Sequence, residues 1–175
     1  MPYDIDLSDE FAQLDRFYAD AEAWLDAPDA VLFAVDDDVS GWSPAQHLHH
    51  IGVANGMSLT AALYAAKGRG ETGGAPDEGG RAVLEREQIP RNRLQAPKQV
   101  SPSEEIDRAA AREAISRSRG KLDELRDQQE ALATAEGRIE HPRMGMLNGP
   151  EWLRFVRIHS QHHHAIIEDI LAAVE

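Results

Sequence analysis

Residues 151–175 read EWLRFVRIHSQHHHAIIEDILAAVE and hold four of the chain's eight histidines within six positions, 159–164. Neither glycine nor proline interrupts this run. The three residues before it, Asn148, Gly149 and Pro150, supply a helix start, because Asn or Gly caps free amides and proline is tolerated in a first turn. The pattern predicts one long helix through Glu175.

One face of this predicted helix is apolar and contains two of the histidines. At about 100° per residue, several side chains fall within about 50° of one line along the helix: Trp152, Phe155, Val156, His159, His163, Ile166 and Ile170. His162 lies toward the edge of this stripe, and His164 points away from it. We therefore expect His159 and His163 to face the core.

Length and composition favour one domain, residues 1–175, in a soluble cytoplasmic protein. No run approaches the roughly 18 apolar residues of a membrane span, and the acidic N-terminus lacks the layout of a signal peptide. The net charge of −13 argues against nucleic-acid and membrane partners. The absence of cysteine excludes disulfides, thiolate nucleophiles and Cys-type zinc sites, so a metal would need His, Asp or Glu ligands.

Three further helices are expected upstream. The first runs from Ser8, its predicted cap, to about Ala27, where Pro28 follows; the second from a Ser43 cap and Pro44 to about Lys67; and the third from the segment 101–105 to near Gly137. Residues 29–41 are interpreted as a connection. Residues 68–100 contain six glycines and three prolines and predict a long connection with only a short turn near 82–87. No useful strand alternation is present. The pattern indicates an all-α four-helix bundle, with this long connection between helices two and three.

A third inward histidine lies on the second predicted helix. Five residues lie within about 40° of His50, so it also lies on a mostly apolar stripe: Gln46, Ala54, Met57, Ala61 and Tyr64. Small residues beside His50 leave room at its level. His49 is about a quarter turn away, and His47 is intermediate. We expect both to be boundary or surface residues, with His47 the one that touches the rim of the site.

This spacing predicts a three-histidine metal site. His159 and His163 are four residues apart and can bind one ion together, and His50 supplies a ligand from a second helix. Three protein ligands leave a position open for water or substrate, as in catalytic metal sites. The alternative is three buried histidines with ordinary hydrogen-bond partners, and the need to satisfy three imidazoles at once favours the metal.

Other candidate sites are weaker. The glycines of residues 68–74 lack the Gly-Lys-Ser/Thr ending of a phosphate-binding loop. Ser43 serves as a cap, and Ser160 projects about 100° from His159, so neither is a convincing nucleophile. His141, beside Pro142, is expected to fix a turn. Neither Glu151 nor Glu168 is a convincing general base.

Several motifs together resemble the DinB/YfiT-like superfamily of metal-dependent enzymes. They are Trp42-Ser43-Pro44 followed by His50 in a W-S-x-x-x-x-x-x-H pattern, His141-Pro142-x-x-Gly145, Glu151-Trp152 and His159-x-x-x-His163. The resemblance covers most of the chain. It implies a four-helix bundle whose metal is held by His50, His159 and His163.

The resemblance also implies a class of chemistry. Members include transferases and isomerases that use a low-molecular-weight thiol, and others are described as hydrolases. We expect a divalent ion (zinc or nickel first, iron or manganese as alternatives), a small-molecule substrate, a thiol cosubstrate in the transfer case, and a homodimer. The competing interpretation is a non-catalytic, stress-associated protein that binds a metal or small ligand.

Overall fold

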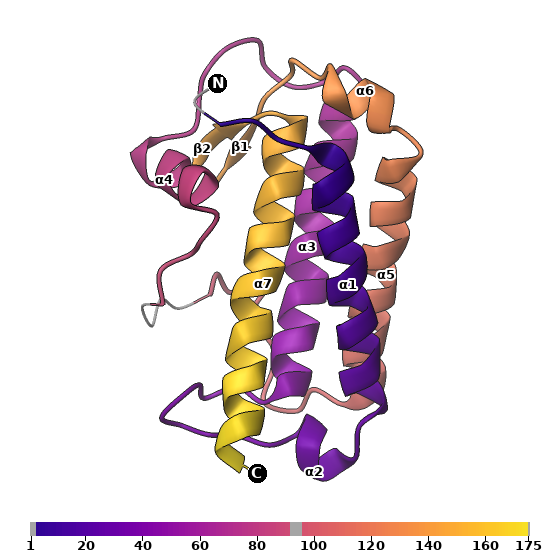
Figure 1. Ribbon diagram of the computed structural model, residues 1–175, viewed down its shortest axis with the longest axis vertical. Coiled ribbons are helices and arrows are strands. Elements are labelled where there is room, and N and C mark those ends of the chain that lie inside the picture. The colour runs from indigo at the N-terminus through magenta and orange to yellow at the C-terminus, as the bar shows by residue number, and fades with distance from the viewer. Residues whose placement is uncertain (1–2, 92–95, 175) are drawn as a thin grey trace.

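Four long helices lie side by side in the computed structural model, which describes residues 3–91 and 96–174 (Figure 1). They are α1 (Leu7–Asp26), α3 (Pro44–Ala66), α5 (Arg108–Arg126) and α7 (Gly149–Val174). In Figure 1, α1 and α7 run downward, whereas α3 and α5 run upward. Three short stretches lie outside the described residues: 1–2, 92–95 and 175. The second belongs to the predicted long connection, and the third is the predicted end of the last helix. The mostly helical chain confirms the predicted all-α class.

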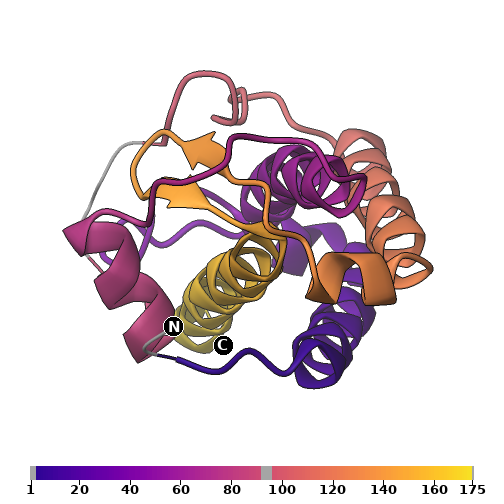
Figure 2. The same ribbon diagram turned by 90° about the horizontal axis from the view of Figure 1, so that it is seen from above.

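The packing order places α3 between α5 and α7, and α1 contacts both α5 and α7 (Figure 2). Two parallel helices, α3 and α5, are therefore neighbours. Because parallel neighbours need a connection that runs back along their length, the chain between residues 67 and 107 returns from one end of the helices to the other (Figure 1).

Side-chain caps fix where the long helices begin. The Ser43 hydroxyl accepts from the Gln46 N–H at 3.3 Å, and the Gln46 side chain accepts from the Ser43 N–H at 2.9 Å, so the predicted start of α3 is confirmed as a capping box. For α1 the predicted cap, Ser8, is wrong, because Asp6 accepts from the Ser8 and Asp9 N–H groups. For α5 the start is Arg108 rather than residues 101–105, because Asp107 caps it.

Short elements occupy the predicted connections. One turn, α2 (Asp29–Leu32), follows α1, and α4 (Glu78–Arg86) replaces the shorter turn expected near 82–87. The third predicted helix ends early: α5 stops at Arg126, and α6 (Gln129–Ala133) follows after two residues. A hairpin, β1 (Ile139–His141) and β2 (Gly145–Leu147), precedes α7. Strands of three residues are too short to produce the alternation that would have predicted them.

The buried face of α3 differs from the predicted one. Met57 and Tyr64, expected on the inner stripe with His50, are 57% and 47% exposed, whereas Leu48, Ile51 and Leu59 are fully buried. Because α3 is covered by α5 on one side and α7 on the other, its buried arc is wide and His50 lies near one edge of it. The predicted stripe, which was centred on His50, therefore included residues that face solvent.

Gly52 allows α3 to approach α5 closely. A Cβ built at Gly52 would lie 2.4 Å from the backbone carbonyl carbon of Ala114, closer than packed atoms tolerate. Gly56, one turn further along the same helix, has no atom within 4 Å of the corresponding point. The first glycine is therefore needed for packing, and the second is not.

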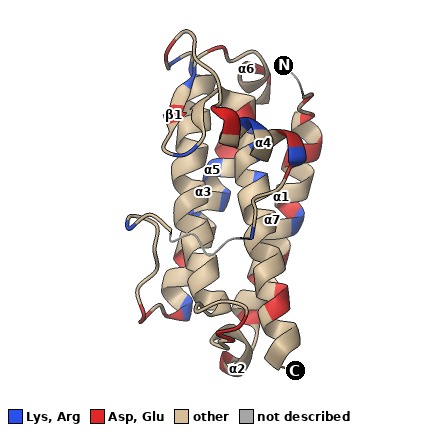
Figure 3. Ribbon diagram, turned by 90° about the vertical axis from the view of Figure 1, so that its left-hand side faces the viewer, with Lys and Arg blue, Asp and Glu red and all other residues tan. Residues whose placement is uncertain are grey.

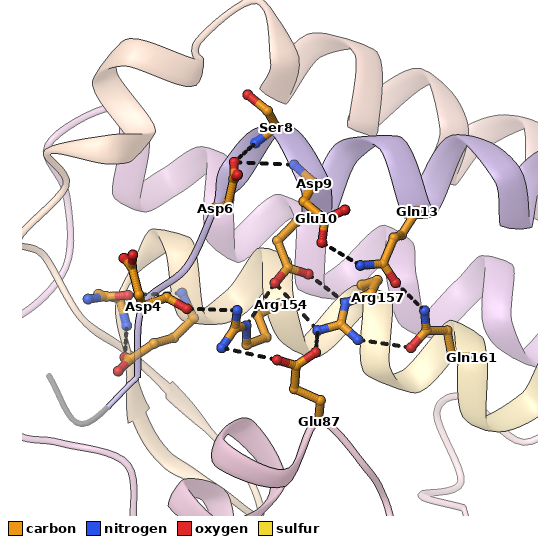
Figure 4. A network of polar contacts seen from close by, with 12 residues as sticks. Asp4, Asp6, Ser8, Asp9, Glu10, Gln13, Glu87, Arg154, Arg157 and Gln161 are labelled. Carbon is orange, nitrogen blue, oxygen red and sulfur yellow. Dashed lines mark hydrogen bonds and ion pairs between the residues drawn. The ribbon is translucent and has the colours of Figure 1, made fainter.

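A buried ion network joins α1, α4 and α7 (Figure 4). The Glu10 carboxylate, 1% exposed, accepts from the Arg154 Nε–H at 2.7 Å and the Arg157 Nε–H at 2.6 Å. Glu87, the residue that ends α4, accepts from Arg157 at 2.6 Å. Glu87 has a φ of 53°, a left-handed conformation that is uncommon for a residue with a side chain. The network thus holds the end of α4 against α7.

Charges elsewhere are mixed. On the side drawn in Figure 3, Lys and Arg are dispersed among Asp and Glu over several elements. Within the described ranges, no helix combines the length and apolar character required to cross a bilayer.

Replacing Gly52 with Ala should lower the free energy of unfolding by about 1–3 kcal/mol, because the added methyl group collides with backbone rather than with a movable side chain. The matched control, Gly56→Ala, should raise it by about 0.5–1 kcal/mol through helix propensity. Urea denaturation followed by circular dichroism measures both. Equal effects of the two substitutions would contradict the close approach of α3 to α5.

Replacing Glu10 with Ala should lower the free energy of unfolding by about 3–5 kcal/mol, because two buried guanidinium groups lose a shared partner. The control is Glu22→Ala, which removes an ion pair with Arg119 in which the Glu22 side chain is 54% exposed. That change should cost less than about 1 kcal/mol. The same urea titration compares them, and a small effect at Glu10 would show that the network contributes little.

Candidate metal site

The structure brings the three predicted histidines together between α3 and α7. Nε2 of His50 lies 3.1 Å from Nε2 of His159. The His163 ring centroid is 4.6 Å from that of His50 and 4.7 Å from that of His159. One ring nitrogen from each residue falls within 4.8 Å of the other two. The four-residue spacing on α7 and the third histidine on α3 thus converge as the sequence predicted.

The other nitrogen of each ring has its own partner. His50 Nδ1 donates to the Val100 carbonyl oxygen at 2.8 Å, and His159 Nδ1 lies 3.3 Å from the Asn55 Oδ1. His163 Nδ1 lies 3.0 Å from Nδ1 of His47. A carbonyl oxygen can only accept, so a proton on Nδ1 of His50 and His159 leaves Nε2 with a free lone pair. Histidine ligands of metals have this arrangement, with the second nitrogen held by a neighbour.

Burial keeps the three imidazoles neutral. His50 is 4% and His163 9% exposed, and His159 is partly buried. Burial is the main cause that lowers the pKa of each ring below its ordinary value, and neighbouring imidazoles lower it further. At neutral pH these rings can therefore offer lone pairs without first losing a proton.

The donor set suits a divalent transition metal. Two nitrogens bound at about 2.0–2.1 Å to a tetrahedral zinc lie about 3.3 Å apart, close to the 3.1 Å between the His50 and His159 Nε2 atoms. Imidazole nitrogen suits zinc, nickel and iron. In residues 3–91 and 96–174, the group has three members and includes no carboxylate. It would therefore leave at least one position on a four-coordinate ion without a ligand from this group.

Aromatic rings pack against two of the three histidines. The Trp42 ring lies 5.2 Å from the His50 ring, and Phe155 stacks on His159 at 5.7 Å. His141, at the end of β1, packs on Phe155 at 4.5 Å and on Trp152 at 5.1 Å. These ring contacts contribute to the burial of His50 and His159.

The remaining histidines of α7 do not join the group. His164 faces α1, where it contacts Asp20 at 2.9 Å and the Trp24 ring at 4.8 Å. His162 is partly buried beside His163. These positions agree with the prediction that His162 lies at the edge of the face that carries His159 and His163 and that His164 points away from it.

On α3 the prediction for His47 was right about its contact and wrong about its depth. As expected it touches the site, through His163, but it is buried (2% exposed) rather than a boundary or surface residue. His49 is partly buried, and its Nδ1 has no hydrogen-bond partner within the described part of the chain.

The other candidates have structural contacts. Ser160 donates to the Val156 carbonyl at 2.8 Å and accepts from Asn55 at 2.8 Å. Glu151 accepts from Arg138 at 2.8 Å and from the Asn148 N–H at 2.9 Å. Ser43 is a cap, and Glu168 lies at the surface, 3.4 Å from His164. None is placed to act as a nucleophile or general base at the three histidines.

Two contacts of the site were missed from the sequence. Asn55 is 1% exposed, and an asparagine in the mostly apolar stretch Ile51–Leu59 is a signal that could have identified it. The Val100 contribution is a backbone carbonyl in a connection without a motif, and no residue type marks it. No sequence pattern could therefore have identified that contact.

Comparison with known proteins identifies the family. The model of the DinB superfamily matches residues 13–167, which include all three histidines. The chain belongs to the DinB superfamily. Searches of curated proteins and of solved structures found no match. The DinB resemblance expected from the Trp42-Ser43 and His159-x-x-x-His163 motifs is thus confirmed, while the chemistry of this DinB member is a separate question.

His141 should make the stability of this DinB protein pH dependent. As predicted, it holds a turn, since its Nδ1 accepts from the Arg143 N–H at 3.2 Å. Burial lowers the pKa of His141 from 6.5 to about 4. Between pH 6.5 and pH 4 this histidine binds a proton in the unfolded chain but not in the folded protein. The free energy of unfolding therefore falls as the pH is lowered from about 6.5 to 4.

Urea denaturation of metal-free protein at pH 7 and pH 5 tests this contribution. The variant His141→Phe cannot be protonated and retains ring packing on Trp152, so its stability relative to the wild type should improve at pH 5. Parallel pH dependences of the two proteins would show that His141 does not contribute.

Proposed function

We propose that this chain is a metal-dependent enzyme in which His50, His159 and His163 bind one divalent ion, with zinc or nickel preferred and iron or manganese as alternatives. The observation that carries the proposal is the arrangement of the ring nitrogens. In each of the three rings one nitrogen has a hydrogen-bond partner outside the group, and a nitrogen of each ring lies close to nitrogens of the other two. The same proposal treats α1, α3, α5 and α7 as the four-helix bundle expected from the sequence, with residues 67–107 as its long connection.

The reaction class we propose is thiol-dependent S-transfer or hydrolysis of a small molecule. A bound ion would supply Lewis acidity, lowering the pKa of a thiol or a water and polarising an electrophile. The chain has no cysteine, so a reacting thiol would come from a cosubstrate. The protein's own part is to hold three neutral imidazoles in place, with Trp42 packed against His50 and Phe155 against His159.

A second candidate is a non-catalytic metal-binding protein. The low exposure of His50 and His163 favours it, since an ion enclosed by protein serves a structural role more readily than a catalytic one. The two candidates share the metal site and differ only in whether a substrate reaches it.

Metal content tests the shared step. Protein purified without a histidine tag and loaded with zinc should contain about one ion per chain by elemental analysis, and each of His50→Ala, His159→Ala and His163→Ala should lose most of it. The matched controls, His162→Ala and His164→Ala, remove histidines from the same helix outside the group and should retain the ion. Retention by the His50 and His163 variants would eliminate the three-histidine site.

Activity assays then separate the candidates. Metal-loaded protein would be screened for thiol conjugation to electrophiles and for hydrolysis of esters, amides and lactams. An enzyme should show rates that disappear after chelation and in the His163→Ala variant. Full metal content without any of these rates would favour the binding protein.

A further inference from the structure

Ser40, His47 and His163 form a chain of hydrogen bonds that ends at the candidate metal site. His163 Nδ1 lies 3.0 Å from His47 Nδ1, and His47 Nε2 lies 2.9 Å from the Ser40 hydroxyl. His47 is 2% exposed and comes from the first turns of α3. Neither the predicted ligand set nor the family motif includes Ser40 or His47.

The partner of His163 differs in kind from the partners of the other two ligands. Val100 offers a carbonyl oxygen, which can only accept. The Asn55 amide is fixed because its nitrogen donates to Ser160 at 2.8 Å, which leaves the oxygen toward His159. An imidazole, by contrast, can present either a proton or a lone pair, so His47 accepts from His163 only in one tautomer.

Ser40 can support that tautomer, because a serine hydroxyl oxygen can accept from an imidazole N–H. With the proton of His47 on Nε2, the Ser40 oxygen accepts it, and His47 Nδ1 is left with a lone pair for His163. The Ser40 oxygen is held in place because it also accepts from the Trp42 N–H at 3.2 Å, and the Ser40 N–H donates to the Asp36 carbonyl at 2.7 Å. The Trp42 ring packs on His47 at 5.3 Å and restricts its rotation.

We propose that His47 is a positioning residue for the metal site: held by Ser40, it fixes the proton of His163 on Nδ1 and directs the Nε2 lone pair toward His50 and His159. This inference rests on the proposed metal binding. His47 itself is not in the group of mutually close nitrogens, so the proposal assigns it no direct contact with the ion. Its role is to orient a ligand and to raise the affinity of the site.

Substitutions at His47 separate hydrogen bonding from simple packing. The side-chain amide introduced by His47→Asn can place an oxygen near the former Nδ1, whereas His47→Ala removes the acceptor. We expect His47→Ala to weaken zinc binding by about 10- to 100-fold in a competition titration with a chromophoric chelator, and His47→Asn to recover most of this loss. The matched control, His49→Ala, removes a histidine of the same helix that lies outside the group and should leave the affinity unchanged.

A second readout does not require metal. Long-range ¹H–¹⁵N NMR of the histidine rings in metal-free protein should show His163 protonated on Nδ1 and His47 on Nε2 in the wild type. Ser40→Ala removes only a hydroxyl at a partly exposed position before α3, so it should fold even if His47 variants do not. It should weaken zinc binding in the same direction as His47→Ala and mix the tautomers of His47.

The outcomes distinguish this inference from the proposed function. Wild-type affinity in His47→Ala, equal weakening in the Ala and Asn variants, or a His163 ring protonated on Nε2 in the wild type would each overturn the positioning role while leaving the metal site intact. Failure of the wild type to bind zinc, nickel, iron or manganese would overturn the metal site and the positioning role together. Weakening by His47→Ala with recovery by His47→Asn supports the proposal.

Discussion

Three neutral imidazoles packed against one another cannot all present protons to the same point. The facing nitrogens of His50 and His159 are 3.1 Å apart, so at least one must offer a lone pair, and an ion at their meeting point would require a lone pair from each ring. Each ring must then place its proton on the far side, where a buried N–H needs an acceptor. The surroundings of the site supply these acceptors from separate parts of the chain: the connection before α5, the middle of α3 and the start of α3.

Contacts on two opposite sides of α7 restrict its rotation about its own axis. Arg157 lies about 160° around the helix from His159, and its guanidinium is held by the buried Glu10 of α1. On the opposite side, His159 and His163 meet α3. Rotation of the helix would break ion pairs on one side while moving the ligands on the other. The network in Figure 4 thus has a structural role at a distance from the histidines it helps to orient.

The parts of the site that follow from helical periodicity were predictable. His159 and His163 share a face at any ordinary helical pitch, and the Ser43 cap fixed the start of the helix that carries His50. Parts that depend on where chain segments meet were not. The outward exposure of Met57 follows from α3 having two neighbours, and the depth of His47 follows from its contact with His163. Two helix starts were also predicted at the wrong residues. Asp6 rather than Ser8 caps α1, and Asp107 caps α5 after the segment 101–105 where its start was expected, because several acidic or hydroxyl residues lie near each start and only one occupies the capping position.

The hydrogen bond from His50 to Val100 has a consequence for how this protein can vary. A backbone carbonyl is present whichever side chain the residue carries, so Val100 and its neighbours can be exchanged without removing the acceptor, provided that the path of the chain is kept. The orientation of His50 therefore does not depend on which side chains surround Val100. The surface near Val100 can therefore change in composition while His50, His159 and His163 keep their orientation.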